Sequence, residues 1–258
     1  MADGDYERGR GREIGAIAAE LKRLAAARRD GATARPAVFV LNGWAASSHA
    51  WDLCQFPRER IFSYVEQLDG EPEKAIESTE RCILVGWSMG GSSALRLFAR
   101  WPEKVAGLVL IAATPRMMED KESGWKGMSP RRLEALRYGL VMTRGEGFFG
   151  VPEGKPNPYL ADEPENLERG LKYLLETDVR PELSARCPAP GVSVHVFQSE
   201  HDGIVRAANA EYLRGIFQQA SVTMVPGVEH ALPIFIPEKI DEAVDTCIRF
   251  AAAGQNPA

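Results

Sequence analysis

Ser88 has the sequence setting of a serine that attacks acyl groups. It is the central residue of Gly86-Trp87-Ser88-Met89-Gly90, which follows the apolar run RCILV and opens the helical pattern GSSALRLFAR. A serine on a tight turn between a strand and a helix is exposed at the end of the sheet, and small neighbours let the backbone pass closely. The start of the helix adds positive potential for a developing oxyanion. This pattern predicts a nucleophilic serine.

Such a serine needs a histidine base and a carboxylate that orients the base. Asp202 follows the apolar run 192–197, and His230 follows the apolar run 222–225. The chain order serine, acid, histidine is the one that accompanies this turn, and parallel sheets place their sites beyond the carboxyl ends of strands. We therefore predict Ser88, Asp202 and His230 as a catalytic triad, with Glu200 as the reserve acid.

The other three histidines are weaker candidates for the base. His195 lies inside an expected strand and is best interpreted as a packed residue, while His201 lies before the last strand and would line the rim of the site. His49 lies near the first loop, where it could contact substrate.

Two backbone N–H groups are expected to hold the oxyanion. One belongs to Met89, directly after the serine, and the other to Trp44 in the loop Leu41-Asn42-Gly43-Trp44-Ala45. The alternative for Trp44 is a core aromatic residue, which burial tendencies alone also allow.

Short apolar runs that alternate with helical patterns must position these groups. Runs without polar alternation, separated by helices, are typical of a parallel sheet covered on both faces. The expected strands are 37–41, 81–85, 105–111, 192–197 and 222–225, and the expected helices are 91–100, 207–217 and 237–250. The predicted fold class is therefore α/β.

The segment 115–187 interrupts this alternation. It contains two or three helical stretches with a Gly/Pro-rich joint, and it is too long for a structureless loop. We expect residues 37–114 and 188–258 to form the core, residues 115–187 to form a helical lid, and residues 1–36 to form an amphipathic lead-in helix.

The first half of this lid is basic. Its arginines Arg131, Arg132, Arg137 and Arg144 are candidates to bind a phosphate or an acidic carrier protein. The alternative is that they lie on solvated helix faces, which is the ordinary place for such charges.

Composition excludes several classes of function. The 258 residues carry a net charge of −5, which gives no reason to expect nucleic acid as a partner. The longest apolar run, 105–113, is too short to span a bilayer. The four cysteines show no zinc spacing and no signal peptide is present, so we expect a reduced, cytoplasmic protein and a monomer.

No cofactor is expected either. The segment 145–150 matches GxGxxG, but no strand precedes it and Val151-Pro152 follows where the dinucleotide fingerprint needs a helix.

Together these motifs resemble a known superfamily. The segments VLNGWAASSHAWD, ILVGWSMGGSSALRLFARWPEKVAGLVLIAATP, GLKYLLETDVRPEL, HDGIV and EHA are similar to those of α/β-hydrolases, most of all the pimeloyl-acyl-carrier-protein methyl ester esterases of biotin synthesis. The resemblance implies a mostly parallel sheet with an inserted helical lid, hydrolysis of a carrier-linked methyl ester, and the same triad and oxyanion residues.

The sequence departs from this family at its N-terminal side. Asn42 stands where most members have histidine, and only 44 residues separate Trp44 from Ser88, which predicts a shortened or lost strand and helix between them. The lead-in helix stands where the usual first strands would be. Two other functions stay open: a carboxylesterase or thioesterase for other acyl groups, and a non-catalytic binding protein of the same fold.

Overall fold

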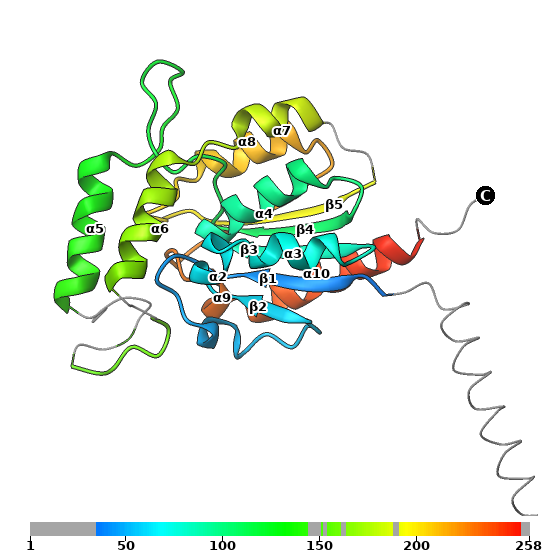
Figure 1. Cartoon of the computed structure of the whole chain (residues 1–258), viewed down its shortest axis with the longest axis horizontal. Coiled ribbons are helices and arrows are strands. Elements are labelled where there is room, and N and C mark those ends of the chain that lie inside the picture. Colours follow the sequence, from blue (N-terminus) through cyan, green and yellow to red (C-terminus); the bar gives the residue numbers. More distant parts are fainter. Residues whose placement is uncertain (1–34, 144–150, 152–153, 161–163, 188–190, 254–258) are drawn as a thin grey trace, which may run out of the picture. The chain divides into compact units, whose positions relative to one another are not determined.

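The computed structural model describes residues 35–143, 151, 154–160, 164–187 and 191–253 (Figure 1). The helix expected within residues 1–36 and the GxGxxG match at 145–150 lie outside the described residues.

In the described part, six strands form one parallel sheet. They are β1 (Ala37–Leu41), β2 (Arg60–Phe62), β3 (Cys82–Trp87), β4 (Val105–Ile111), β5 (Ser193–Ser199) and β6 (Ser221–Val225). Their spatial order is β2-β1-β3-β4-β5-β6, and every neighbouring pair is parallel. The predicted α/β class is confirmed.

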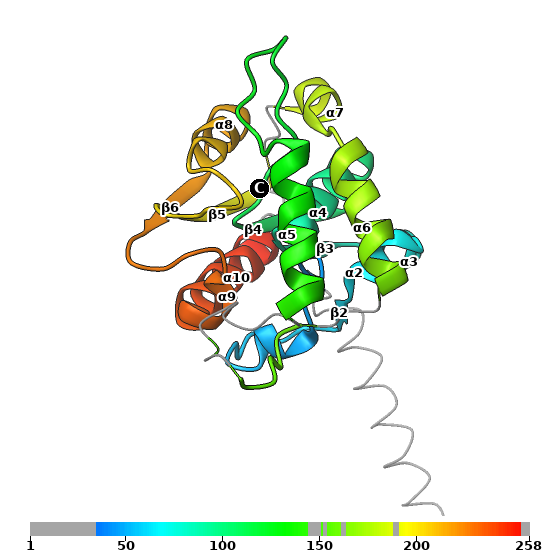
Figure 2. The same cartoon turned by 90° about the vertical axis from the view of Figure 1, so that its left-hand side faces the viewer.

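Helices cover both faces of this sheet. The helical segments are η1 (Ser48–Trp51), α2 (Tyr64–Leu68), α3 (Glu71–Glu77), α4 (Met89–Arg100), α5 (Pro130–Thr143), α6 (Pro164–Glu176), α7 (Arg180–Arg186), α8 (Ala208–Ile216), α9 (Leu232–Phe235) and α10 (Pro237–Ala253). Helices α4 and α8 lie on one face, and α10 lies on the other (Figures 1 and 2).

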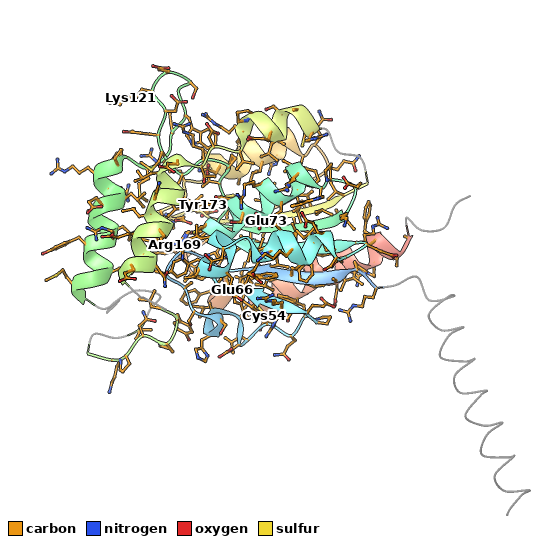
Figure 3. All side chains as sticks on the ribbon, in the orientation of Figure 1. Cys54, Glu66, Glu73, Lys121, Arg169 and Tyr173 are labelled. Carbon is orange, nitrogen blue, oxygen red and sulfur yellow. The ribbon has the colours of Figure 1, made fainter. Side chains whose placement is uncertain are left out.

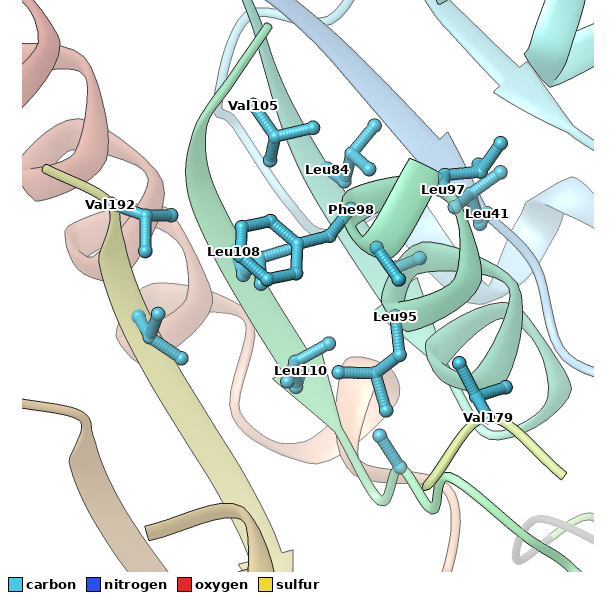
Figure 4. Close-up of a cluster of buried hydrophobic side chains, with 14 of the residues drawn as sticks. Leu41, Leu84, Leu95, Leu97, Phe98, Val105, Leu108, Leu110, Val179 and Val192 are labelled. Atoms are coloured by element: carbon cyan, nitrogen blue, oxygen red, sulfur yellow. The ribbon is translucent and has the colours of Figure 1, made fainter. Parts of the chain in front are cut away.

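Side chains that alternate along the strands divide the core into two layers. In β3, Leu84 packs against Leu95 and Phe98 of α4 on one face (Figure 4). Its neighbour Val85 belongs to the cluster on the opposite face, which includes Val244 of α10. All five side chains are fully buried. Strands that are apolar on both faces therefore read as continuous apolar runs, which is why β3 was recognisable from sequence.

The strand β2 is not among the strands expected from the sequence. It has three residues, pairs only with β1 and begins with the exposed Arg60. A three-residue edge strand leaves too few positions for an apolar pattern. With the short helices α2 and α3, it occupies the interval between Trp44 and Ser88, where the spacing predicted a shortened or lost strand and helix; they are short but present.

The segment inserted between β4 and β5 leaves and re-enters the core at one point, near residues 116 and 178. Residues Arg116 and Asp178 form an antiparallel bridge, and the Val179 N–H donates to the Pro115 carbonyl at 2.9 Å. The Asp178 carboxylate also binds Arg116 at 2.5 Å and Arg180 at 2.7 Å. Burial would raise the pKa of Asp178, but hydrogen bonds from Arg180 and Arg116 lower it to about 2. This ion-pair cluster ties the two ends of the insertion together.

Between these ends, α5 and α6 lie at the carboxyl ends of the strands (Figures 1 and 2). Helix α6 buries Leu167 and Leu174 in apolar clusters. Polar side chains add two contacts: Arg169 pairs with Asp69 at 2.5 Å, and the Tyr173 hydroxyl lies 3.3 Å from Ser93 Oγ of α4 (Figure 3). Helix α7 packs on α4, where Leu183 is fully buried. None of the described helices is long and apolar enough to cross a membrane.

Candidate active site

Ser88 is the single residue between β3 and α4, and its backbone is strained. Its φ of 56° and ψ of −118° lie outside the regions that residues with a side chain ordinarily adopt. Its N–H donates to the Ile111 carbonyl of β4 at 2.9 Å, which holds the turn against the sheet. The chain turns sharply here because the strand must end and the helix must begin within one residue.

The two glycines of the motif are required by space. A Cβ at Gly86 would lie 2.5 Å from the Gly90 carbonyl oxygen, and a Cβ at Gly90 would lie 2.0 Å from the Leu41 carbonyl oxygen. Both distances are shorter than any real contact of a Cβ atom, and both neighbours are backbone. The first turn of α4 therefore packs directly on β1.

Asp202 lies in the turn after β5, and its carboxylate is fully shielded from solvent. Its Oδ1 accepts the N–H groups of Ile204 at 2.7 Å and Val205 at 2.9 Å. Its Oδ2 accepts from His230 Nδ1 at 2.8 Å and lies 3.3 Å from Gln198 Nε2. Burial would raise the pKa of Asp202, but His230 and the two backbone N–H groups outweigh burial and lower it. The carboxylate is thus held ionised in a buried position.

His230 lies in the loop after β6, beside the Ser88 turn. Its carbonyl accepts from Trp87 Nε1 at 3.0 Å, and the two rings lie 5.9 Å apart between centroids. Ser199 Oγ donates to the carbonyl of Val228, which joins the loop of the histidine to the loop of the acid. With Nδ1 bound to Asp202, the imidazole keeps Nε2 for a second partner.

Ser88, His230 and Trp44 line one apolar pocket, whose empty volume is about 510 Å³ including the part open to solvent. The inserted segment supplies most of the remaining wall. The lining residues are Gly43, Trp44, Trp87, Ser88, Met117, Leu133, Leu136, Leu140, Leu160, Leu174, Ile204 and His230. Among the described lining residues His230 alone has an ionisable side chain, so this wall fits an uncharged, apolar acyl chain.

The two expected oxyanion donors lie beside this serine. Met89 is the first residue of α4, and the first N–H groups of a helix have no acceptor within the helix. Trp44 lines the pocket, and its indole Nε1 donates to the Leu167 carbonyl of α6 at 3.1 Å. Both interpretations of Trp44 therefore have support, because its ring packs under α6 while its loop borders the serine.

The three candidate arginines that the structure describes do not line this pocket. Arg131 and Arg132 are exposed at the start of α5, and Arg137 binds Glu134 at 2.6 Å. Arg144 lies outside the described residues.

The other candidates also lie away from the serine. His49 is exposed, pairs with Asp52 at 2.9 Å and lines a different hollow, while His201 and Glu200 are exposed. His195 is half-buried in β5, and burial lowers its pKa. The structure brings Ser88, Asp202, His230, Trp44 and Met89 together and leaves the other described candidates outside.

Two buried polar residues at the site were not predicted. Gln198 contacts the Asp202 carboxylate, and Asn42 begins the loop that carries Trp44. Each is a polar residue that directly follows an expected strand, 37–41 for Asn42 and 192–197 for Gln198. That position is the signal that could have identified them.

Comparison with known proteins places the chain. Residues 22–243 match the family model described as the alpha/beta hydrolase family. The chain belongs to this family. The likeness to its pimeloyl-acyl-carrier-protein methyl ester esterases is also confirmed: a protein of that name from Nitrosospira multiformis is 27% identical, over 84% of this chain and 94% of its own. A second, from Nitrosomonas europaea, is 25% identical, over 81% and 94%.

Solved structures agree on the fold. A bromoperoxidase from Bacillus anthracis superposes with a TM-score of 0.64 at 16% identity, covering 83% of this chain and 92% of its own. An esterase from Exiguobacterium antarcticum superposes with a TM-score of 0.61 at 17% identity, with the same coverage. Together with its esterase relatives, the family identifies the chain as an enzyme of the carboxylic ester hydrolase class.

Proposed function

We propose that this hydrolase is a serine carboxylesterase that removes the methyl ester from pimeloyl-acyl-carrier protein in biotin synthesis. The observation that carries the proposal is the hydrogen bond between His230 Nδ1 and Asp202 Oδ2 at 2.8 Å, together with the pocket that His230 and Ser88 both line. A buried carboxylate, an oriented imidazole and a strained serine are the parts that two-step acyl transfer needs.

In the first step, His230 Nε2 takes the Ser88 hydroxyl proton while Oγ attacks the ester carbonyl carbon. The N–H groups of Trp44 and Met89 hold the resulting oxyanion, and Asp202 remains ionised beside the imidazolium. As the intermediate collapses, the imidazolium gives its proton to the leaving methoxide, which departs as methanol. Ser88 then carries the acyl group.

In the second step, His230 removes a proton from water, and the hydroxide attacks the acyl-enzyme carbonyl. The Ser88–acyl bond breaks, the free carboxylic acid leaves, and the proton returns to Ser88. The apolar lining disfavours the ionised product, because a carboxylate without a partner is costly to bury. This cost assists product release.

The names of the relatives and the shape of the pocket support the substrate. The relatives from Nitrosospira and Nitrosomonas are named for this ester, and an apolar pocket suits the methylene chain of a pimeloyl group. Arg131 and Arg132 are exposed on α5 and would contact the acidic surface of the carrier protein. Arg137 contributes less because Glu134 already binds it. Since Arg144 lies outside the described residues, its proposed part in this surface rests on sequence alone.

A second candidate function is a carboxylesterase or thioesterase for small acyl groups. The observation in its favour is that none of the three described arginines lines the pocket. Such an enzyme would not need a carrier protein.

The two functions are separated by assaying pimeloyl-carrier-protein methyl ester and p-nitrophenyl acetate side by side. We expect wild type to demethylate the carrier-linked ester and Ser88→Ala to hydrolyse neither substrate. Replacing both Arg131 and Arg132 by Ala should lower kcat/KM about 10-fold for the carrier-linked ester only. The matched control replaces the exposed Arg214 and Arg249 by Ala. Hydrolysis of aryl esters alone would exclude the biotin function and leave the second candidate.

A further inference from the structure

Asn42 is a completely buried amide at the end of β1. Its side-chain Oδ1 accepts from the Gly43 N–H and from Trp51 Nε1, both at 3.1 Å. Its Nδ2 donates to the Ala46 carbonyl at 2.9 Å. Its own carbonyl accepts from Gln67 Nε2 at 2.9 Å. The side chain therefore bonds to both ends of the loop 43–46.

This loop needs outside support to keep its shape. Ala45 has a φ of +60°, a conformation that residues with a Cβ rarely adopt. The Ala46 N–H donates to the Gly43 carbonyl at 3.2 Å, which closes a tight turn around Trp44 and Ala45. Such a turn persists only where its surroundings fix it, and the Asn42 amide is the side chain that spans it.

The far end of the loop is bound to the inserted segment. Ser47 donates its N–H to the Tyr159 carbonyl at 2.8 Å and its hydroxyl to the Pro158 carbonyl at 2.5 Å. Ala46 forms an antiparallel bridge with Leu160, which lines the pocket. The loop is thus held from inside by Asn42 and from outside by residues 158–160.

We propose that Asn42 is a positioning residue for the oxyanion site, acting through the backbone N–H of Trp44. It never touches substrate. By holding Gly43 and Ala46, the Asn42 side chain sets the direction of the Trp44 N–H. The indole N–H of Trp51 in turn holds the Asn42 side-chain amide in place. The inference rests on the proposed serine mechanism, because that mechanism gives the Trp44 N–H its role.

The first test is Asn42→Leu, which keeps the size of the side chain and removes its three hydrogen bonds without adding charge. With p-nitrophenyl acetate as substrate, kcat should fall about 10- to 100-fold while KM changes less than about 3-fold, since a displaced oxyanion donor loses part of its full effect. An acetate ester keeps the measurement independent of carrier-protein binding.

The second variant is Trp51→Phe, which removes the indole N–H that holds Asn42 Oδ1 together with the smaller ring of this buried side chain. We expect kcat to fall about 3- to 10-fold, a smaller effect than that of Asn42→Leu. The matched control is Trp125→Phe, which removes an indole N–H that donates to the Arg116 carbonyl at 3.0 Å, far along the chain from the loop. This control should keep kcat within about twofold of wild type.

Two inhibitors, an alkyl trifluoromethyl ketone and the corresponding methyl ketone, show whether Asn42 positions the oxyanion site or only stabilises the folded protein. The fluorinated ketone forms a bond to Ser88 Oγ, and its carbonyl oxygen becomes an oxyanion, whereas the methyl ketone only fills the pocket. In Asn42→Leu and Trp51→Phe, inhibition by the fluorinated ketone should weaken by the same factor as kcat, and inhibition by the methyl ketone should not change.

Unchanged inhibition by the fluorinated ketone in a folded Asn42→Leu protein would overturn the inference. If Asn42→Leu does not fold, Trp51→Phe decides, and a kcat equal to that of wild type would overturn the inference. A wild type that neither hydrolyses the aryl ester nor binds the fluorinated ketone would instead contradict the proposed function.

Discussion

The turns after β3, β5 and β6 differ in kind from the helices α5 and α6 that lie over them. The turns place Ser88, Asp202 and His230 by buried hydrogen bonds and a strained backbone. The two helices supply leucines to the pocket and leave Tyr138 and Met142 about three-fifths exposed. Chemistry depends on particular atoms at fixed distances, whereas acyl-chain binding depends on shape and apolarity. Substitutions in the turns should therefore slow the hydrolysis of every ester, and substitutions in α5 and α6 should slow the hydrolysis of only some esters.

The largest effect is expected from Asp202→Asn. An amide cannot hold His230 in the correct tautomer, so kcat should fall about 10³- to 10⁴-fold for acetate, octanoate and carrier-linked esters alike. The measurement is kcat for all three substrates at neutral pH.

The matched control is Asp178→Asn, which removes a carboxylate that is also paired but lies at the base of the insertion. It should keep kcat within a few-fold of wild type. If Asp202→Asn lost activity for one acyl-chain length only, the assignment of chemistry to the turns and of acyl-chain binding to α5 and α6 would be wrong.

A smaller and selective effect is expected from Leu136→Asp in α5. A carboxylate in the apolar wall should lower kcat/KM for octanoate esters about 10- to 100-fold and change acetate esters less than about 3-fold. Leu136→Met is the control, because it keeps the apolar surface. Equal losses for both chain lengths would show that α5 also supports the chemistry.

The smallest effect is expected from Gly139→Ala. A Cβ at this position in α5 would meet no atom of the described residues within 4 Å, whereas one at Gly90 would collide with the Leu41 carbonyl oxygen. Replacing glycine by alanine inside a helix should raise the free energy of unfolding by about 0.5–1 kcal/mol without changing kcat. Urea unfolding should show a higher free energy of unfolding for Gly139→Ala and a lower one for Gly90→Ala. A loss of stability in Gly139→Ala would contradict this expectation.

Much of the fold was readable from sequence because its central strands are buried on both faces. Runs such as RCILV stand out, and each predicted triad residue follows such an apolar run. The edge strand β2 was missed because three residues carry no pattern. The supporting amides Asn42 and Gln198 were missed because a polar residue after an apolar run does not reveal its hydrogen-bond partners, which only the folded loops bring to it: Gln67 and Trp51 for Asn42, and Asp202 for Gln198.

The role of the arginines could not be settled by charge alone. The pattern showed a basic stretch, but whether a basic side chain faces the pocket, the solvent or an acidic neighbour depends on how α5 packs. Arg137 illustrates the point, because Glu134 lies one turn before it in the same helix and binds it.

The most direct test of the central claim is to find which residue a fluorophosphonate modifies. The reagent should form a bond to Ser88 Oγ, and mass spectrometry of the digested protein should place one adduct on the peptide containing Ser88. The adduct should be absent in Ser88→Ala and form far more slowly in Asp202→Asn. An adduct on any other residue, or undiminished labelling of Ser88→Ala, would contradict the account.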